Sequence, residues 1–506
     1  MRRRILFVTF LCLLSSGAGA QVELRTEAQL SLSDGPTPLW LNANKYGLSS
    51  LDKTNGYVRV GAFRPLELDS ARRWAWSAGA DVAVAGGYTS TVIVQQAYAE
   101  LRWLKGRLTV GSKEQPLQLK DQRLSSGSQA LGVNARPVPA VRLELPDYWD
   151  IPGLNHWLGL KGHISYGLTT DTRWQKNFTA RQSDYSENVR LHTKAGYLRI
   201  GQPRKPLTVE AGLEMGCQYG GKTYLISQGL TQPVENEAGL KGMIHAFIPG
   251  GEEVLEKDMV YKNTSGNHVG SYLLRVNYDR PRWGVSIYAD HVFDDQSQMF
   301  FFSNNSYGEN GNWQEKGNRY LVFDLKDMML GVELRLKDCP WLQAFVAEYL
   351  YTKHQSGPIY HDHSEHLLDH ISALDDYYNH SVYGAWQHWG QVMGNPLFLS
   401  PIYNDNGKIM VCDNRFTAWH LAATGTPLPR LSYRLMCTFQ RGWGTYRHPY
   451  PNPRNNVSMM AEAAYSFPQE SPLQGLTVKG AFGADRGALL GNNTAFQLTL
   501  AKQFSL

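Results

Sequence analysis

The chain has 506 residues and a net charge of +5, and no run of five or more basic residues, so its composition gives no sign of a nucleic-acid partner. Beyond residue 20 there is no run of 18 or more apolar residues, which excludes a membrane-spanning helix. Glycine, tyrosine and tryptophan are abundant, with 48, 27 and 14 residues, and long helical patterns are few. This composition predicts an all-β protein.

The first twenty residues have the pattern of a secretory signal peptide. A basic run at residues 2–4 precedes the apolar stretch ILFVTFLCLL, and small residues suited to cleavage occupy positions 18–20. We therefore expect residues 1–20 to be removed and the mature chain to begin near Gln21.

The rest of the chain alternates apolar and polar residues with a period of two, which is typical of strands with one apolar face. Three clear examples are QQAYAELRW (95–103), LSYRLMCTF (431–439) and VSMMAEAAYSF (457–467). These segments extend over about 10 to 13 residues, which is longer than a typical soluble strand and suits a tilted strand that crosses a bilayer.

Tight connections and long connections alternate along the chain. Placing strands between them gives eighteen predicted spans, at 22–32, 56–66, 74–85, 91–103, 107–113, 138–148, 157–169, 189–201, 207–219, 267–279, 283–294, 324–337, 341–353, 410–424, 431–443, 456–467, 476–486 and 494–506.

Long connections follow the odd-numbered strands and short ones follow the even-numbered strands, as in outer-membrane barrels with both chain ends in the periplasm. The predicted fold is therefore all-β: over residues 21–506, a transmembrane antiparallel β-barrel of eighteen strands with long extracellular loops and short periplasmic turns. Its expected location is the cell outer membrane, where lipid and lipopolysaccharide surround it.

The longest predicted connection is an extracellular loop at 354–409 that is rich in histidine and aromatic residues. His366 and His370 are four residues apart, a spacing by which two imidazoles can share a metal on a helix, but the H-E-x-x-H glutamate is missing. We interpret them as part of a polar helix face and expect no metal and no cofactor. The chain contains no G-x-S-x-G motif and no other catalytic constellation, so no catalytic residue is expected.

The aromatic residues of this loop allow two interpretations. Tyr377, Tyr378, Tyr383, Trp386 and Trp389 could form the packing core of the loop itself. Alternatively, some of them could present flat faces to sugar rings, with neighbouring amide and charged groups binding the hydroxyls.

Four stretches together resemble the Wzi-type capsule-assembly family of Gram-negative outer-membrane proteins. They are WLNANKYG (40–47), RLSSGSQALGVNARPVP (123–139), YY…GNPLFLSP (377–401) and DNRFTAWHLAATG (413–425). The resemblance covers essentially the whole mature chain. It implies an eighteen-stranded barrel without enzymatic activity whose extracellular face holds exported capsular polysaccharide at the cell surface.

The expected function is therefore a non-catalytic barrel that binds or organises capsular polysaccharide or exopolysaccharide. The alternative is a porin-like channel for sugars or small solutes, because eighteen strands enclose enough room for one.

The candidate polysaccharide-binding residues lie in three segments of the sequence. Trp386 and Trp389 are the candidates for stacking on sugars, with Asn395 and Arg415 as polar partners. The two tryptophans can share one side only if their segment is helical or forms a turn. Arg136 completes the set, since the proline after it favours extended backbone that would fold its loop inward.

Overall fold

The computed structural model describes residues 22–66, 73–227, 229–249, 265–294, 305–307, 313–315, 326–355 and 375–505. The expected signal peptide and the histidine pair His366 and His370 lie outside these residues.

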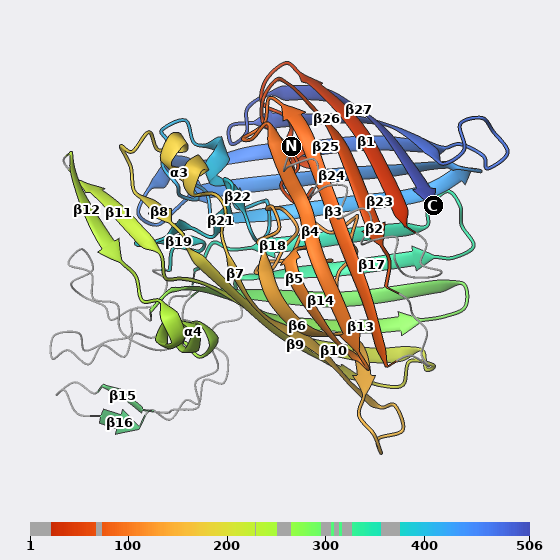
Figure 1. Cartoon of the computed structure of the whole chain (residues 1–506), viewed down its shortest axis with the longest axis horizontal. Helices are drawn as coiled ribbons and strands as arrows, with labels where there is room; N and C mark the ends of the chain where they lie inside the picture. Colours follow the sequence, from red (N-terminus) through yellow and green to blue (C-terminus); the bar gives the residue numbers. More distant parts are fainter. Residues whose placement is uncertain are drawn as a thin grey trace, which may run out of the picture.

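A single antiparallel sheet of eighteen strands forms the body of the molecule (Figure 1). Its strands are β1 (Glu23–Ser33), β2 (Thr54–Arg64), β3 (Trp74–Gly86), β4 (Val92–Trp103), β5 (Gly106–Ser112), β6 (Ala140–Asp150), β7 (Leu158–Leu168), β9 (Arg190–Ile200), β10 (Leu207–Tyr219), β13 (Asn267–Asp279), β14 (Trp283–Asp294), β17 (Met328–Leu336), β18 (Ala344–Tyr351), β23 (Phe416–Leu428), β24 (Leu431–Gly444), β25 (Pro449–Ser466), β26 (Leu476–Gly487) and β27 (Asn493–Ser505).

The sheet closes on itself because its first and last strands pair. β1 and β27 are antiparallel neighbours, with a register that runs from Glu23 opposite Ser505 to Ser33 opposite Ala495. Each remaining strand of this sheet pairs with the strand of the sheet that precedes it and with the one that follows it in the chain. The predicted fold class, an eighteen-stranded antiparallel barrel, is therefore confirmed.

Most strand boundaries also agree with the prediction, and 207–219, 267–279 and 283–294 coincide with β10, β13 and β14. One clear error is β23, which begins at Phe416 rather than at 410. Residues just before it alternate in hydrophobicity because Val411 is buried among the loops, and not because they belong to the barrel wall. The period-two pattern cannot separate these two kinds of burial.

Side chains alternate between the two faces of the barrel as predicted. On β24, Leu435 and Phe439 are 46% and 49% exposed, whereas Met436 and Thr438 between them are buried. Apolar side chains on other strands are exposed in the same way, among them Leu32, Val60, Val84, Val110 and Ile287. A continuous apolar outer face is what a lipid bilayer requires of a barrel.

Exposed tryptophans gather at the end of the barrel that carries the short turns. Trp74 and Trp103 begin β3 and end β4, and their rings stack with centroids 5.9 Å apart. Trp157, Trp283 and Trp341 lie at neighbouring turns of the same end and are also exposed. Indole rings at this level are typical of the interface between membrane and water. Within the residues described, no helix is long and apolar enough to cross a membrane.

The opposite end carries the long connections, and Figure 1 shows their small elements beside the barrel mouth. These elements are α2 (Leu39–Asn42), α3 (Thr172–Phe178), β8 (Tyr185–Glu187), β11 (Lys222–Ser227), β12 (Leu230–Glu235), α4 (Gly239–Phe247), β15 (Asn305–Tyr307), β16 (Trp313–Glu315), β19 (Asn379–His380), β20 (Gly384–Ala385), β21 (Gln387–His388), β22 (Gln391–Val392) and the 3₁₀ turn η1 (Pro401–Tyr403).

The predicted alternation of long and short connections needs one correction. Three connections at the loop end, 87–91, 445–448 and 488–492, are as short as the turns at the other end. At these places the flanking strands extend until a tight turn joins them.

A charge on the lipid-facing side should destabilise this barrel. Val332 lies at the middle of β17, points outward and pairs with Ile287. We expect Val332→Arg to lower the free energy of unfolding by about 2–4 kcal/mol, because a guanidinium near the bilayer midplane must leave water. Urea unfolding in lipid vesicles measures this, with Val332→Leu as the matched control. Equal midpoints for the two variants would contradict a lipid-facing position.

Candidate functional site

The loops fold into the loop end of the barrel and form a common core with its inner wall. Buried residues of the connections 34–53, 113–139, 169–189 and 375–415 pack together with inward-facing wall residues. Contributors from the loops are Leu39, Trp40, Leu41, Leu124, Ala130, Trp174, Tyr185, Tyr377, Tyr378, Trp386 and Phe398. Of the two interpretations of the loop aromatics, burial of this kind supports the packing core.

The connection 113–139 is held inside the barrel by carboxylates on the wall. Glu348 of β18 is fully buried and accepts hydrogen bonds from the Ser125 hydroxyl at 2.6 Å and from the Ser126 backbone N–H at 2.8 Å. It also accepts one from the Tyr288 hydroxyl at 2.5 Å. A buried carboxylate with several donors is a strong anchor, because charge-assisted hydrogen bonds exceed neutral ones in strength.

Two further carboxylates, on other strands, also bind residues of the connection 113–139. Asp290 of β14 forms a fully buried ion pair with Lys120 at 2.6 Å and accepts the Gln129 backbone N–H at 3.0 Å. Glu214 of β10 accepts the Ser128 hydroxyl at 2.9 Å. We call Glu214, Asp290 and Glu348 the carboxylate clamp. It fixes residues 120–129, which include the stretch LSSGSQ, across the lumen.

Trp386 is fully buried beneath these loops. Its indole N–H donates to the Ala130 carbonyl at 3.0 Å. Its ring lies so close to β10 that any side chain larger than hydrogen at Gly216 would clash with it. The prediction that Trp386 stacks on a sugar does not fit this position, because the indole has no exposed face.

Trp389 lies at the tip of the hairpin formed by β21 and β22, so the two tryptophans are not presented on one helical surface. Its φ is +56° and that of Gly390 is +82°, the left-handed conformations that a tight two-residue hairpin turn demands. Such a φ is uncommon for tryptophan. The indole N–H is held by the Thr170 hydroxyl at 3.0 Å, and Arg136 lies over the ring with its Cζ 4.3 Å from the centroid.

Arg136 is buried, as expected for a residue that folds its loop inward, and it donates to the Thr89 hydroxyl at 2.7 Å. Burial lowers its pKa to about 10. Through its contact with the Trp389 ring, Arg136 links the connection 113–139 to the connection 375–415.

The two other candidates lie apart from this pair. Asn395 is buried and donates to the Ser126 hydroxyl at 3.2 Å, while its side-chain oxygen accepts the Leu397 N–H at 3.0 Å. It therefore forms the turn that the sequence Gly-Asn-Pro suggests and supports the clamped segment. Arg415 packs its guanidinium on the Tyr446 ring at 3.6 Å. The structure brings Arg136 and Trp389 together, and it does not join the five candidates into one surface.

Cavities remain between the loops and the inner wall, and they are lined by charged residues that the sequence interpretation missed. The lowest has a volume of about 550 Å³ and lies at the short-turn end, against β1 to β4 and β26 to β27. Arg59 dominates it, with ion pairs to Asp81 at 2.5 Å and to Glu114 at 3.0 Å. Burial raises the pKa of Glu114.

A middle cavity of about 280 Å³ adjoins the lowest one, because Glu27, Arg59 and Glu114 line both. Its other wall carries Arg434, Lys479 and Glu462, with Arg434 paired to Glu462 at 3.1 Å. The cations therefore outnumber the single carboxylate on this side.

Lys45 enters the middle cavity from the connection 34–53. Its ammonium donates to the Gln497 side chain at 2.7 Å. Burial, together with the nearby Lys479, lowers the pKa of Lys45 to about 7. This lysine therefore changes charge near neutral pH.

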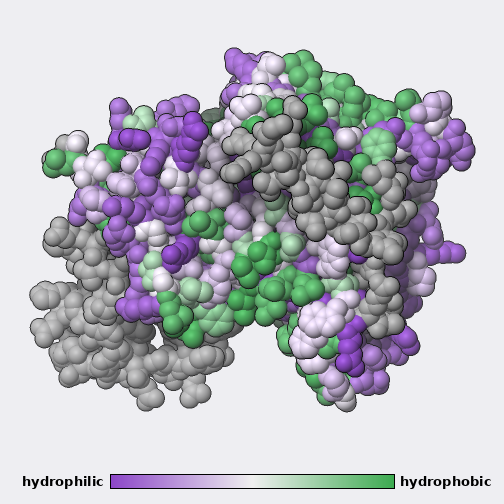
Figure 2. All heavy atoms as spheres, in the orientation of Figure 1, coloured by the Kyte–Doolittle hydropathy of each residue, from purple (hydrophilic) through white to green (hydrophobic). Residues whose placement is uncertain are grey.

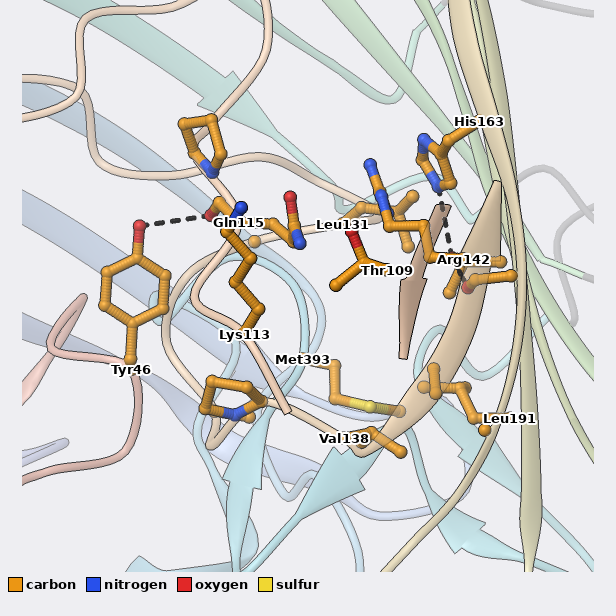
Figure 3. Close-up of a pocket in the computed structure, with 18 of the residues that line it drawn as sticks. Tyr46, Thr109, Lys113, Gln115, Leu131, Val138, Arg142, His163, Leu191 and Met393 are labelled. Atoms are coloured by element: carbon orange, nitrogen blue, oxygen red, sulfur yellow. Dashed lines mark hydrogen bonds between the residues drawn. The ribbon is translucent and has the colours of Figure 1, made fainter. Parts of the chain in front are cut away.

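An upper cavity of about 160 Å³ lies between the connection 113–139 and the wall from β5 to β10 (Figure 3). Lys113, Arg142 and His163 point into it, and His163 shares a hydrogen bond of 3.1 Å with Thr193. Tyr46 lines both this cavity and the middle one, so all three adjoin along the lumen.

The alternation of apolar and polar residues along the strands contains a signal for the charged residues that line the cavities. Arg59 stands between the outward residues Val58 and Val60, and Glu462 stands between Ala461 and Ala463. A charge in a polar position of a transmembrane strand must face the lumen. The sequence does not show which charged residues pair across neighbouring strands, because the pairs depend on the strand register. Among the described residues, no group of three or more His, Cys, Asp or Glu side chains is placed to hold a metal.

Comparison with known proteins finds no matching family model and no matching curated protein. Solved structures do match. OccK5 (OpdH) of Pseudomonas aeruginosa has a TM-score of 0.46 at 9% identity, covering 96% of this chain and 98% of that protein. OccK1 (OpdK) of the same organism has 0.47 at 11% identity, covering 96% and 99%. Acinetobacter baumannii OccAB4 has 0.44 at 9% identity, covering 96% and 98%.

The closed sheet, its apolar outer face and the exposed tryptophans at one end together indicate a location in a membrane. The protein is an outer-membrane β-barrel. The resemblance to the Wzi-type family, however, is wrong: the matching structures are Occ and OprD proteins, and no family model supports it. The expected capsule-organising function is wrong with it.

The carboxylate clamp should determine how firmly the connection 113–139 is held. We expect Glu348→Ala to leave the buried Ser126 N–H and two hydroxyls without an acceptor, at about 1–3 kcal/mol for each unsatisfied group. The local readout is the rate of trypsin cleavage after Arg123, which lies within the clamped segment and has an exposed side chain. Glu348→Gln keeps one acceptor oxygen and should cleave more slowly than Glu348→Ala. Unchanged cleavage in both variants would contradict the anchoring role.

Proposed function

We propose that the protein is a porin-like channel that passes small polar or charged solutes across the outer membrane. The observation that carries this proposal is the line of three adjoining cavities along the lumen, lined by charged and polar side chains. Charged side chains are costly inside a membrane protein unless they face a water-filled space or one another. Several charged side chains of this barrel face one of the three cavities.

The size of the cavities supports solutes that are small. The upper cavity, of about 160 Å³, has less than one third of the volume of the lowest cavity, which is about 550 Å³. The loops fixed by the carboxylate clamp account for this narrowing, since they take up the lumen beside the cavity. A solute that passes here must fit beside the loops or displace them.

The lining supports solutes that are polar. Both signs of charge are present, with Arg59 and Lys479 near Glu114 and Glu462. Rings or rows of charged side chains select among ions and polar molecules by attraction and by the cost of removing their water. Tyr46 lines both the middle and the upper cavity, and its hydroxyl donates to the Gln115 carbonyl at 3.1 Å (Figure 3).

Single-channel recording in planar lipid bilayers tests the proposal. We expect stepwise conductance from purified, refolded protein, with steps kept small by the loops. Heat-denatured protein from the same preparation is the control. Refolded barrel that inserts and yet gives no steps in any salt would contradict a channel function.

Charge variants separate this conductance from that of a contaminating porin. Lys479→Glu and Arg434→Gln change the charge of the middle cavity. Both should shift the reversal potential in a salt gradient toward cation preference. Steps whose selectivity is the same in every variant would come from another protein.

Lys45 should make the selectivity depend on pH. Because its pKa is lowered to about 7, its ammonium gains charge as the pH falls from 8 to 6. We expect anion preference to rise over this range in the native protein and to change less in Lys45→Met. The variant isolates Lys45 from the other charged groups that face it, which are Lys479, Arg434, Glu462 and Glu27. Identical pH profiles would show that Lys45 does not face the conducting path.

A further inference from the structure

The helix α4 packs on the outside of the barrel rather than in its mouth. The Tyr166 hydroxyl of β7 donates to the Met243 carbonyl of α4 at 3.2 Å. Tyr166 faces outward, because its neighbours Ser165 and Gly167 line the upper cavity inside the lumen. Ala246 of α4 is buried against outward residues of β10 in the same way. In Figure 1, α4 lies at the loop end, outside the strands.

The wall beneath α4 carries two polar side chains at outward positions. Outward positions of β9 are occupied by His192 and Lys194, whose neighbours Leu191 and Thr193 line the lumen. His192 is fully buried, and its ring lies 5.6 Å from that of Phe247. The Lys194 ammonium donates to the Phe247 carbonyl and lies 4.7 Å from its ring. The helix therefore covers an imidazole and an ammonium that would otherwise face lipid.

The other side of α4 is apolar and exposed. Leu240 and Ile244 are 75% and 52% exposed and Ile248 continues the same side, while Phe247 lies at its border with the barrel wall. Their spacing of three to four residues places them on one face of a helix. Figure 2 shows apolar residues at α4 and on the adjoining outer surface of the barrel.

A polar edge borders this apolar face. Lys241 and His245 both pair with Glu237, each at 2.6 Å. The helix thus has one side on the barrel wall, one apolar side and one charged edge. This is the pattern of a helix that lies in the plane of a membrane interface.

Strand register places α4 level with the lipid-facing surface. Tyr166 and His192, which the helix covers, are paired partners on β7 and β9. Leu168 of β7, two residues nearer to the loop end, is an exposed apolar residue on the same outer face. The apolar outer face therefore reaches the level of the helix, and the two surfaces adjoin.

We propose that α4 is embedded in the membrane leaflet on the loop side, where Leu240, Ile244, Phe247 and Ile248 contact lipid acyl chains. The helix replaces the polar wall of β9 as the surface that meets lipid. This proposal is independent of channel activity, because it rests on the outer face of the barrel alone.

Spin labelling of protein refolded into dioleoylphosphatidylcholine vesicles tests it. Ile244→Cys carries the nitroxide, after Cys339, Cys412 and Cys437 have been replaced by alanine; the fourth cysteine, Cys217, is fully buried and is kept. Leu168→Cys is the reference for a lipid-facing site, and Lys241→Cys is the reference for a water-facing site on the same helix. Collision with molecular oxygen, which concentrates in the bilayer, is compared with collision with a water-soluble nickel chelate. Heat-modifiable migration in gels confirms that each variant is folded.

We expect the label at 244 to favour oxygen over nickel to the same degree as the label at 168, and the label at 241 to favour nickel. Nickel access at 244 equal to that at 241 would overturn the proposal, because the helix would then lie in water. Low access to both reagents at 244 would also overturn it, since protein would cover the face. In that case, spin–spin broadening would identify a second copy of the chain as the cover.

Discussion

The pairing of β1 with β27 is the constraint on which the rest of the structure depends. Inside a bilayer no water is available to backbone N–H and C=O groups, so a sheet that crosses it must have no free edge. The register from Glu23–Ser505 to Ser33–Ala495 closes the last gap. Closure then gives every strand an inner and an outer face, and the period of two in the sequence follows from that geometry.

Closure at eighteen strands also leaves a lumen that wall side chains alone do not fill. The loops and the wall share this space. Where wall carboxylates face the connection 113–139, as Glu214, Asp290 and Glu348 do, they bind its backbone and hydroxyls and draw it inward. Where the loops leave space, as around Arg59, charged residues of the wall line cavities instead. The same inward row of polar residues thus anchors the loops and forms the proposed solute path.

The outer face of β9 departs from the apolar pattern where another element covers it. His192 and Lys194 interrupt the outward row of β9 because α4 lies over them. The helix is short, and its position against the barrel wall is what explains its exposed apolar side. In water, exposed residues such as Leu240 would be a liability, whereas beside the lipid-facing surface they continue it.

The sequence by itself determined the class of the protein, the number of strands and most of their boundaries, because alternation is a local property and each strand carries it independently. Only the tertiary structure decided which loop residues are buried. Trp386 lies against Gly216 and Asn395 against Ser126, contacts between residues far apart in the chain that no local pattern records. For the same reason, aromatic residues that suggested a sugar-binding surface proved to be packing, and similar phrases in the sequence suggested a family that the comparisons contradict. Burial of a loop is decided by what it meets across the lumen, and that depends on closure of the whole barrel.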